Sequence, residues 1–156
     1  MAEFLENDVQ SVQPNQPVLL TTSIGCSKGY VYHRSGSGSI TLRGVTNNCF
    51  ARYQVTFNGN IAIPNGGTAG PISVSLALDG EPIPTSRAIV TPAAAAANPP
   101  TQDNFFNVTC TAIIDVPRGC CTNVSVENTS ESTTPATTPA PTILTQNANL
   151  TVSRIA

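Results

Sequence analysis

The sequence predicts an all-β domain built as an antiparallel sandwich, and three features of the chain indicate it. Apolar and polar residues alternate from Phe50 to Phe57 and again from Ile72 to Leu78, which is the period of strands with one buried face. Prolines, glycines and an asparagine between Pro64 and Pro71 require a turn between the two runs. No segment keeps a helical period. We therefore expect two long strands at the centre of the fold.

The second run has two distinct faces. We expect its larger apolar residues to be buried: Ile72, Val74, Leu76 and Leu78. We expect the opposite face, which holds three small residues, to be free: Ser73, Ser75 and Ala77.

Shorter runs predict further strands on both sides of this centre, at Val18–Thr22, Tyr30–His33, Ser39–Arg43, Ile83–Val90, Asn104–Val116, Cys121–Glu127 and Ile143–Ile155. Asp79-Gly80 is a tight-turn signal between the run Ile72–Leu78 and the strand expected at Ile83–Val90. The alternation slips at Ile113-Ile114, which predicts a bulge or bend. Many short strands with regular turn signals favour a jelly roll, which we place at residues 18–156 after an N-terminal arm at residues 1–17.

The N-terminal arm carries too little apolar surface to fold alone. We weigh two interpretations and favour the first: a strand or arm packed on its own domain, or an arm docked on a neighbouring protein. In the second interpretation, four apolar side chains would attach the protein to a particle: Phe4, Leu5, Val9 and Val12.

Composition limits the partners. The chain has 156 residues, enough for one domain with a real core, and is 40% hydrophobic but only 10% charged. A formal net charge of -2 gives no field that would steer nucleic acid or an anionic membrane. No apolar run is long enough to span a bilayer, and acids in residues 1–13 stand where a secretory signal needs a basic region. We expect neither nucleic acid nor membrane as a partner.

The five cysteines are an odd number, so at least one is unpaired or bonded between chains. Their spacing lacks the C-x-x-C pattern of zinc sites, and we predict no metal or cofactor. We favour reduced, buried thiols. A disulfide between Cys26 and Cys49 is a further hypothesis for oxidising surroundings, because each lies at the edge of a predicted strand.

Nothing in the sequence calls for an enzyme. The one histidine, His33, is expected to be a surface or hydrogen-bonded residue, and no nucleophile elbow, phosphate loop or zinc-protease motif occurs. The closest pair of acids, Asp79 and Glu81, is explained by a hairpin turn.

The aromatic residues suggest subunit contacts more than a lectin site, because the chain has no tryptophan. We predict a subunit contact at three tyrosines: Tyr30, Tyr32 and Tyr53. A glycan-binding alternative would use three polar loops: Ser35–Ser39, Thr91–Asn104 and Thr129–Pro141.

Three segments resemble the tumour-necrosis-factor/C1q-like jelly rolls of bacterial and phage surface proteins, a family that includes the C-terminal domain of the exosporium protein BclA. They are GPISVSLALDGEPIP, TAIIDVPRGC leading into TNVSVENTS, and NANLTVSRIA. The similarity covers most of the chain from about Tyr30 onward. It implies a homotrimer in which one sheet of each subunit packs around the three-fold axis.

The chain departs from BclA-type proteins in lacking a collagen-like Gly-X-Y tract before the domain. A free-standing jelly roll with a short arm is similar to small phage accessory proteins. The resemblance therefore implies a non-enzymatic capsid decoration protein, made in the bacterial cytoplasm without a signal peptide and carried on the virion surface. Its partners would be its own copies and the major capsid protein. The alternatives are a fibre tip that binds a receptor or host cell-surface glycan, and a spore-surface protein.

Overall fold

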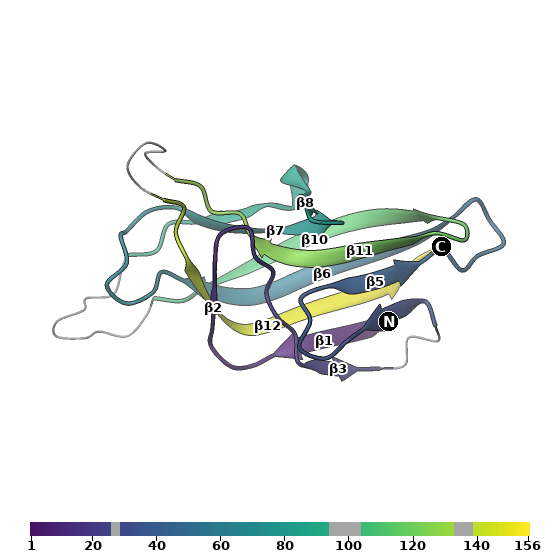
Figure 1. The fold of residues 1–156 in the computed structure, drawn as a ribbon, viewed down its shortest axis with the longest axis horizontal. Coiled ribbons are helices and arrows are strands. Elements are labelled where there is room, and N and C mark those ends of the chain that lie inside the picture. Colours follow the sequence, from purple (N-terminus) through teal and green to yellow (C-terminus); the bar gives the residue numbers. More distant parts are fainter. Residues whose placement is uncertain (26–28, 94–103, 133–138) are drawn as a thin grey trace.

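The computed structural model describes residues 1–25, 29–93, 104–132 and 139–156, and these residues form two antiparallel sheets packed as a sandwich (Figure 1). Sheet A has the order β10-β6-β12-β1-β3, and β2 also pairs with β12. Sheet B has the order β4-β5-β11-β7-β8, and β9 also pairs with β7. Most spatial neighbours are distant in sequence, which is the connectivity of a jelly roll and confirms the predicted fold class.

The strands of sheet A are β1 (Ala2–Glu6), β2 (Gln10–Val12), β3 (Thr22–Ile24), β6 (Phe50–Ala62), β10 (Phe106–Pro117) and β12 (Ile143–Arg154). Those of sheet B are β4 (Val31–His33), β5 (Ile40–Arg43), β7 (Ile72–Leu78), β8 (Glu81–Pro82), β9 (Ala88–Val90) and β11 (Cys121–Asn128). A short 3-10 helix, η1 (Pro84–Ser86), follows β8. In the described ranges, no helix is long and apolar enough to cross a membrane.

The core lies between the sheets, and β6 crosses its centre. The alternation predicted for this strand is confirmed, because its inward side chains Tyr53, Val55 and Phe57 are fully buried. Burying each such side chain contributes about 1.5–3 kcal/mol. Figure 1 shows that β6, β10, β11 and β12 run along the long axis of the molecule. The sandwich is therefore built around a few long strands.

The outward face of β7 is not free as predicted. Ser73, Ser75 and Ala77 are all buried, as are the inward residues from Ile72 to Leu76. Arg87 and Thr129 both contact the Ser73 hydroxyl, at 3.0 and 3.1 Å, and cover this end of the strand. A strand can thus be buried on both faces when a distant segment of the chain lies over the second one.

Residues 1–17 do not stand apart from the jelly roll. β1 pairs with β12 from Ala2 to Glu6 and also with β3, so it is an internal strand of sheet A. Phe4 and Val12 are 4% and 2% exposed and belong to the subunit's own core, so they cannot attach the protein to a particle. Leu5 is half-buried and Val9 is 49% exposed. Of the four side chains, only Val9 is left largely exposed for attachment, which stays a prediction.

The predicted bulge is in a different strand. β10 keeps an unbroken register with β6 from Phe106 to Pro117, so Ile113 and Ile114 make no bulge. The register instead shifts in β12 between Gln146 and Asn149, where Asn147 has a φ of 53°. Asparagine tolerates this left-handed conformation better than most residues do.

Two shorter predicted strands also differ. The regular strand expected at Val18–Thr22 begins only at Thr22, although Val18 is buried and donates its N–H to Val126 O at 2.8 Å. The strand expected at Ile83–Val90 is interrupted by η1, which begins at Pro84. The Asp79-Gly80 turn is confirmed, because these residues have φ values of 49° and 87° and link β7 to β8.

Candidate functional site

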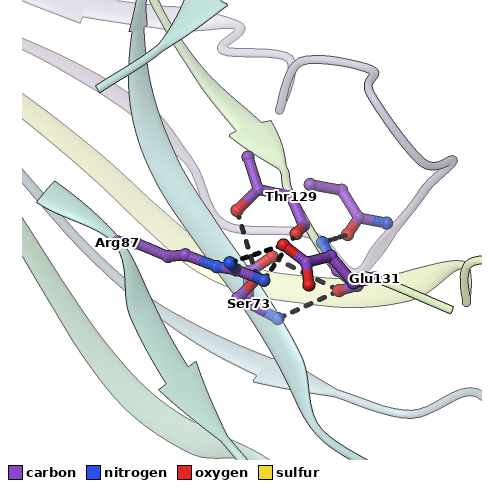
Figure 2. A network of polar contacts seen from close by, with 6 residues as sticks. Ser73, Arg87, Thr129 and Glu131 are labelled. Carbon is purple, nitrogen blue, oxygen red and sulfur yellow. Dashed lines mark hydrogen bonds and ion pairs between the residues drawn. The ribbon is translucent and has the colours of Figure 1, made fainter. Parts of the chain in front are cut away.

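A polar network on the outward side of sheet B joins three segments of the chain through Arg87 (Figure 2). Arg87 Nε donates to Ser73 Oγ at 3.0 Å, and Nη2 donates to Thr129 O at 3.0 Å. Nη1 donates to Glu131 Oε1 at 2.8 Å, and this ion pair is 29% exposed at Arg87 and 75% exposed at Glu131. The guanidinium therefore connects β7, the residues after η1 and the residues after β11.

The backbone that leads into Arg87 is held by Ser86. Its hydroxyl accepts the Leu76 N–H at 3.0 Å and donates to Ile83 O at 2.8 Å. Ile83 N also donates to Leu76 O at 2.8 Å. These bonds pair the backbone N–H and C=O groups of Leu76, which lie on the edge of β7 in the gap between β8 and β9. They also place Arg87 over Ser73.

The segment on the other side of the network is held by two buried polar side chains. Asn128 is fully buried, and its amide donates to Val12 O and Pro141 O, each at 3.0 Å. Its Oδ1 accepts the Ser130 N–H at 3.0 Å, and Ser130 Oγ accepts the Ser73 N–H at 2.9 Å. Residues 128–130 are therefore held rigidly against the end of β7.

Two pockets open on this side of sheet B. The larger, about 710 Å³, is lined by Ser75, Arg87, Glu131 and two prolines, among others. The smaller, about 310 Å³, is lined by Asp79, Asn123, Ser125 and Glu127, among others. In the register of β7 and β11, Ser75 lies directly opposite Glu127, so the two pockets are neighbours.

Ser75 and Glu127, which lie opposite each other on β7 and β11, are both buried and polar. Ser75 is 1% exposed, and its hydroxyl has no hydrogen-bond partner in the described part of the chain. Glu127 is 8% exposed, and its carboxylate accepts the Ser125 hydroxyl at 2.9 Å. The site offers hydrogen bonds to a ligand. Its side chains do not form a nucleophile with an adjacent base.

His33 and Asp79, the other candidates for catalysis, have structural contacts. His33 Nε2 lies 3.0 Å from Ser37 O, so this nitrogen carries the proton, and Nδ1 lies 3.0 Å from Ser23 Oγ. Asp79 Oδ1 accepts the Asn123 N–H at 2.9 Å, which places it in the hairpin that the sequence predicted. Across the described ranges, no three His, Cys, Asp or Glu residues are grouped as a metal centre requires.

The three tyrosines proposed for a subunit contact lie in different environments. Tyr53 is fully buried and its hydroxyl donates to Arg43 O at 2.6 Å, so it cannot make that contact. Burial raises the pKa of Tyr53. Tyr30 packs against the core and beneath the Arg154 guanidinium, which is 4.3 Å from its ring centre. Tyr32 is 64% exposed and stays available.

The cysteines were expected to be buried, and only Cys110 is buried among those that the structure describes. Cys49, Cys120 and Cys121 are exposed free thiols, because they lie at turns and strand ends rather than on inward positions. Cys26 lies outside the described residues, so its proposed disulfide with Cys49 stays a prediction. Of the loops proposed for glycan binding, Ser35–Ser39 is described throughout, whereas residues 94–103 and 133–138 of the other two lie outside the described residues.

Comparison with known proteins supports the fold alone. No family model matches the chain, and no curated protein matches its sequence. Among solved structures, the globular domain of zebrafish complement 1qA protein is similar, with a TM-score of 0.51 and 14% identity. The match covers 96% of this chain and 94% of that one. The chain therefore has the C1q-like jelly-roll fold over nearly its whole length.

We predict that Cys110 resists alkylation in the folded protein. Its burial raises the pKa of the thiol to about 11, so at about pH 8 it stays protonated, and the thiolate is the reactive form. In a timed iodoacetamide reaction read by peptide mass spectrometry, Cys49, Cys120 and Cys121 should be labelled first. Denaturant should release Cys110, which serves as the control. Equal labelling of Cys110 and Cys121 in the folded protein would contradict the placement of Cys110.

Proposed function

We propose that the protein is a non-enzymatic structural module that assembles as a homotrimer through sheet A and decorates the surface of a phage particle. The main support for a trimer is that the outward face of sheet A is broad and has almost no unpaired charge. The similarity to a C1q globular domain supports the fold on which the proposal rests.

The outward side chains of the three neighbouring strands β10, β6 and β12 are nearly all uncharged. On β6 they are Gln54, Thr56, Asn58 and Asn60; on β10 they are Asn107, Thr109, Thr111 and Ile113; on β12 they are Asn149, Thr151 and Ser153. The charges at one end, Arg52 and Asp115, are joined by two hydrogen bonds of 2.7 and 2.8 Å. On the neighbouring strand β1, Glu3 has no ion pair among the described residues and accepts a hydrogen bond from Asn149. Apart from this carboxylate, such a face can be buried without leaving charges unpaired.

The polar groups of this face already bind one another. Asn58 Nδ2 donates to Thr109 Oγ1 at 2.9 Å, and Asn107 Nδ2 donates to Asn60 Oδ1 at 3.1 Å. The hydroxyls of Thr56 and Thr111 are 3.2 Å apart. Because these groups have partners before association, covering them costs less than burying unpaired amides and hydroxyls would.

The edge of sheet A also favours association. β10 is the last strand in the order of the sheet, and it carries Ile113 and Phe106, which are 63% and 47% exposed. A long edge strand with exposed apolar side chains invites pairing or packing with another chain. Closed three-fold symmetry would cover this edge in every subunit.

We predict that Thr111→Arg breaks the trimer and leaves the fold intact. An arginine at this outward position is solvated in a monomer, but at the axis three like charges would be brought together without partners. Analytical ultracentrifugation at micromolar concentration should give a trimer mass for the wild type and a monomer mass for the variant. Thr85→Arg, at an exposed position of η1 in the other layer, is the matched control and should stay trimeric. A monomeric wild type, or a trimeric Thr111→Arg variant, would contradict the proposal.

The location on a virion predicts that the protein co-purifies with phage particles. Val9, which remains exposed beside β2, is the candidate contact with the major capsid protein. Val9→Asp should reduce the amount of protein found in density-gradient fractions that contain capsids, as measured by quantitative mass spectrometry. Thr85→Arg again serves as the control. Recovery in spore-coat fractions, with none in capsid fractions, would overturn the virion location in favour of the spore surface.

A further inference from the structure

We infer that the outward face of sheet B binds an uncharged oligosaccharide in two neighbouring pockets, whose buried polar residues are Ser75 and Glu127. This inference goes beyond the proposed function, because it uses the layer opposite the proposed trimer contact. It refines the glycan-binding alternative from the sequence. Ser39 and residues 129–132 of the expected loops line the pockets, whereas the two buried polar residues lie on the strands β7 and β11.

The strand register brings these two residues together. Ser75 on β7 pairs with Glu127 on β11, and side chains directly opposite each other leave the same face of a sheet. Their chain neighbours Val74, Leu76 and Val126 point into the core, so Ser75 and Glu127 point outward. Ser75 lines the pocket of about 710 Å³ and Glu127 lines the pocket of about 310 Å³.

The Ser75 hydroxyl indicates a ligand at this position. It is buried but has no hydrogen-bond partner among the residues that the structure describes. An unpaired buried hydroxyl costs stability, and most buried polar groups in proteins have a partner. Ala77, two residues along the same face, is equally well buried without a hydroxyl. The partner of Ser75 is therefore expected to come from the pocket.

The pockets offer both donors and acceptors. A guanidinium carries five N–H groups, and the described residues occupy three of those on Arg87. Glu127 has the one hydrogen bond from Ser125 described above and can accept more. A sugar hydroxyl donates and accepts at the same atom, so a row of such hydroxyls matches a surface of this kind.

Charge favours a neutral ligand over an anionic one. Arg87 is neutralised by its ion pair with Glu131, while Asp79 and Glu127 leave the smaller pocket negative. Phosphate, sulfate or carboxylate groups would be repelled there. Pro82 and Pro84 add an apolar wall to the larger pocket, against which the C–H groups of a sugar ring can pack.

The test is a titration of the full-length, ¹⁵N-labelled protein with four uncharged tetrasaccharides: cello-, malto-, laminari- and chitotetraose. A sulfated heparin tetrasaccharide is the anionic comparison. At least one neutral probe should shift the backbone amides of Ser75, Arg87 and Glu127 with a Kd near the millimolar range that weak sites show. Ser75→Ala and Glu127→Gln should each weaken binding by about tenfold, the loss of roughly one good hydrogen bond.

Two controls make the result decisive. Tyr32→Ala removes the exposed aromatic ring of β4, outside both pockets, and should leave binding unchanged. Ser75→Ala should keep or raise the Tm, because the hydroxyl has no partner in the described part of the fold. No shift with any neutral probe, tighter binding of heparin, or loss of binding in Tyr32→Ala would overturn the inference. A lower Tm for Ser75→Ala would also overturn it, since the hydroxyl would then serve the fold. None of these outcomes depends on the trimer mass, so failure here is distinct from failure of the proposed function.

Discussion

The rest of the structure depends on the pairing of β6, which is unbroken with β10 on one side and shifts register once with β12 on the other. β6 pairs with β10 without a break, from Phe50–Pro117 to Ile61–Phe106. Its other edge pairs with β12, which in turn pairs with β1 and β2. Hydrogen bonds on both edges pair the backbone N–H and C=O groups of β6, while its inward side chains enter the core. Sheet A is therefore one rigid layer, and the outward face proposed as the subunit contact is held in a single arrangement.

Sheet B is organised differently. Its strand β7, which pairs with β11 on one edge and with β8 and β9 on the other, is buried on both faces. Arg87 and residues 128–131 cover the second face. A buried polar network of this kind costs little only when its members satisfy one another. Here most of them do, through bonds from Ser73, Asn128 and Ser130. The Ser75 hydroxyl is the exception among the described residues of this network, which is why the same region suggests a binding site.

Alternation in the sequence was sufficient to predict the long strands, because the period of two depends on local residues alone. It predicted the region of β6 and the Asp79-Gly80 hairpin correctly. It could not predict that β7 is covered on its second face, because Arg87 and Thr129 reach it from distant parts of the chain. The same limit applies to residues 1–17, whose strand β1 pairs with residues near the C-terminus. The juxtaposition of Ser75 and Glu127 depends on strand register, and no spacing within the sequence indicates it.

Native-state hydrogen exchange, read residue by residue, tests the central place of β6 most directly. Its amides are bonded to neighbours on both edges, so they should exchange only when the whole domain unfolds and should be the slowest in the protein. Amides of the short edge strands β8 and β9 should exchange much faster through local opening. Exchange in β6 as fast as in β8 would contradict a sandwich built around this strand.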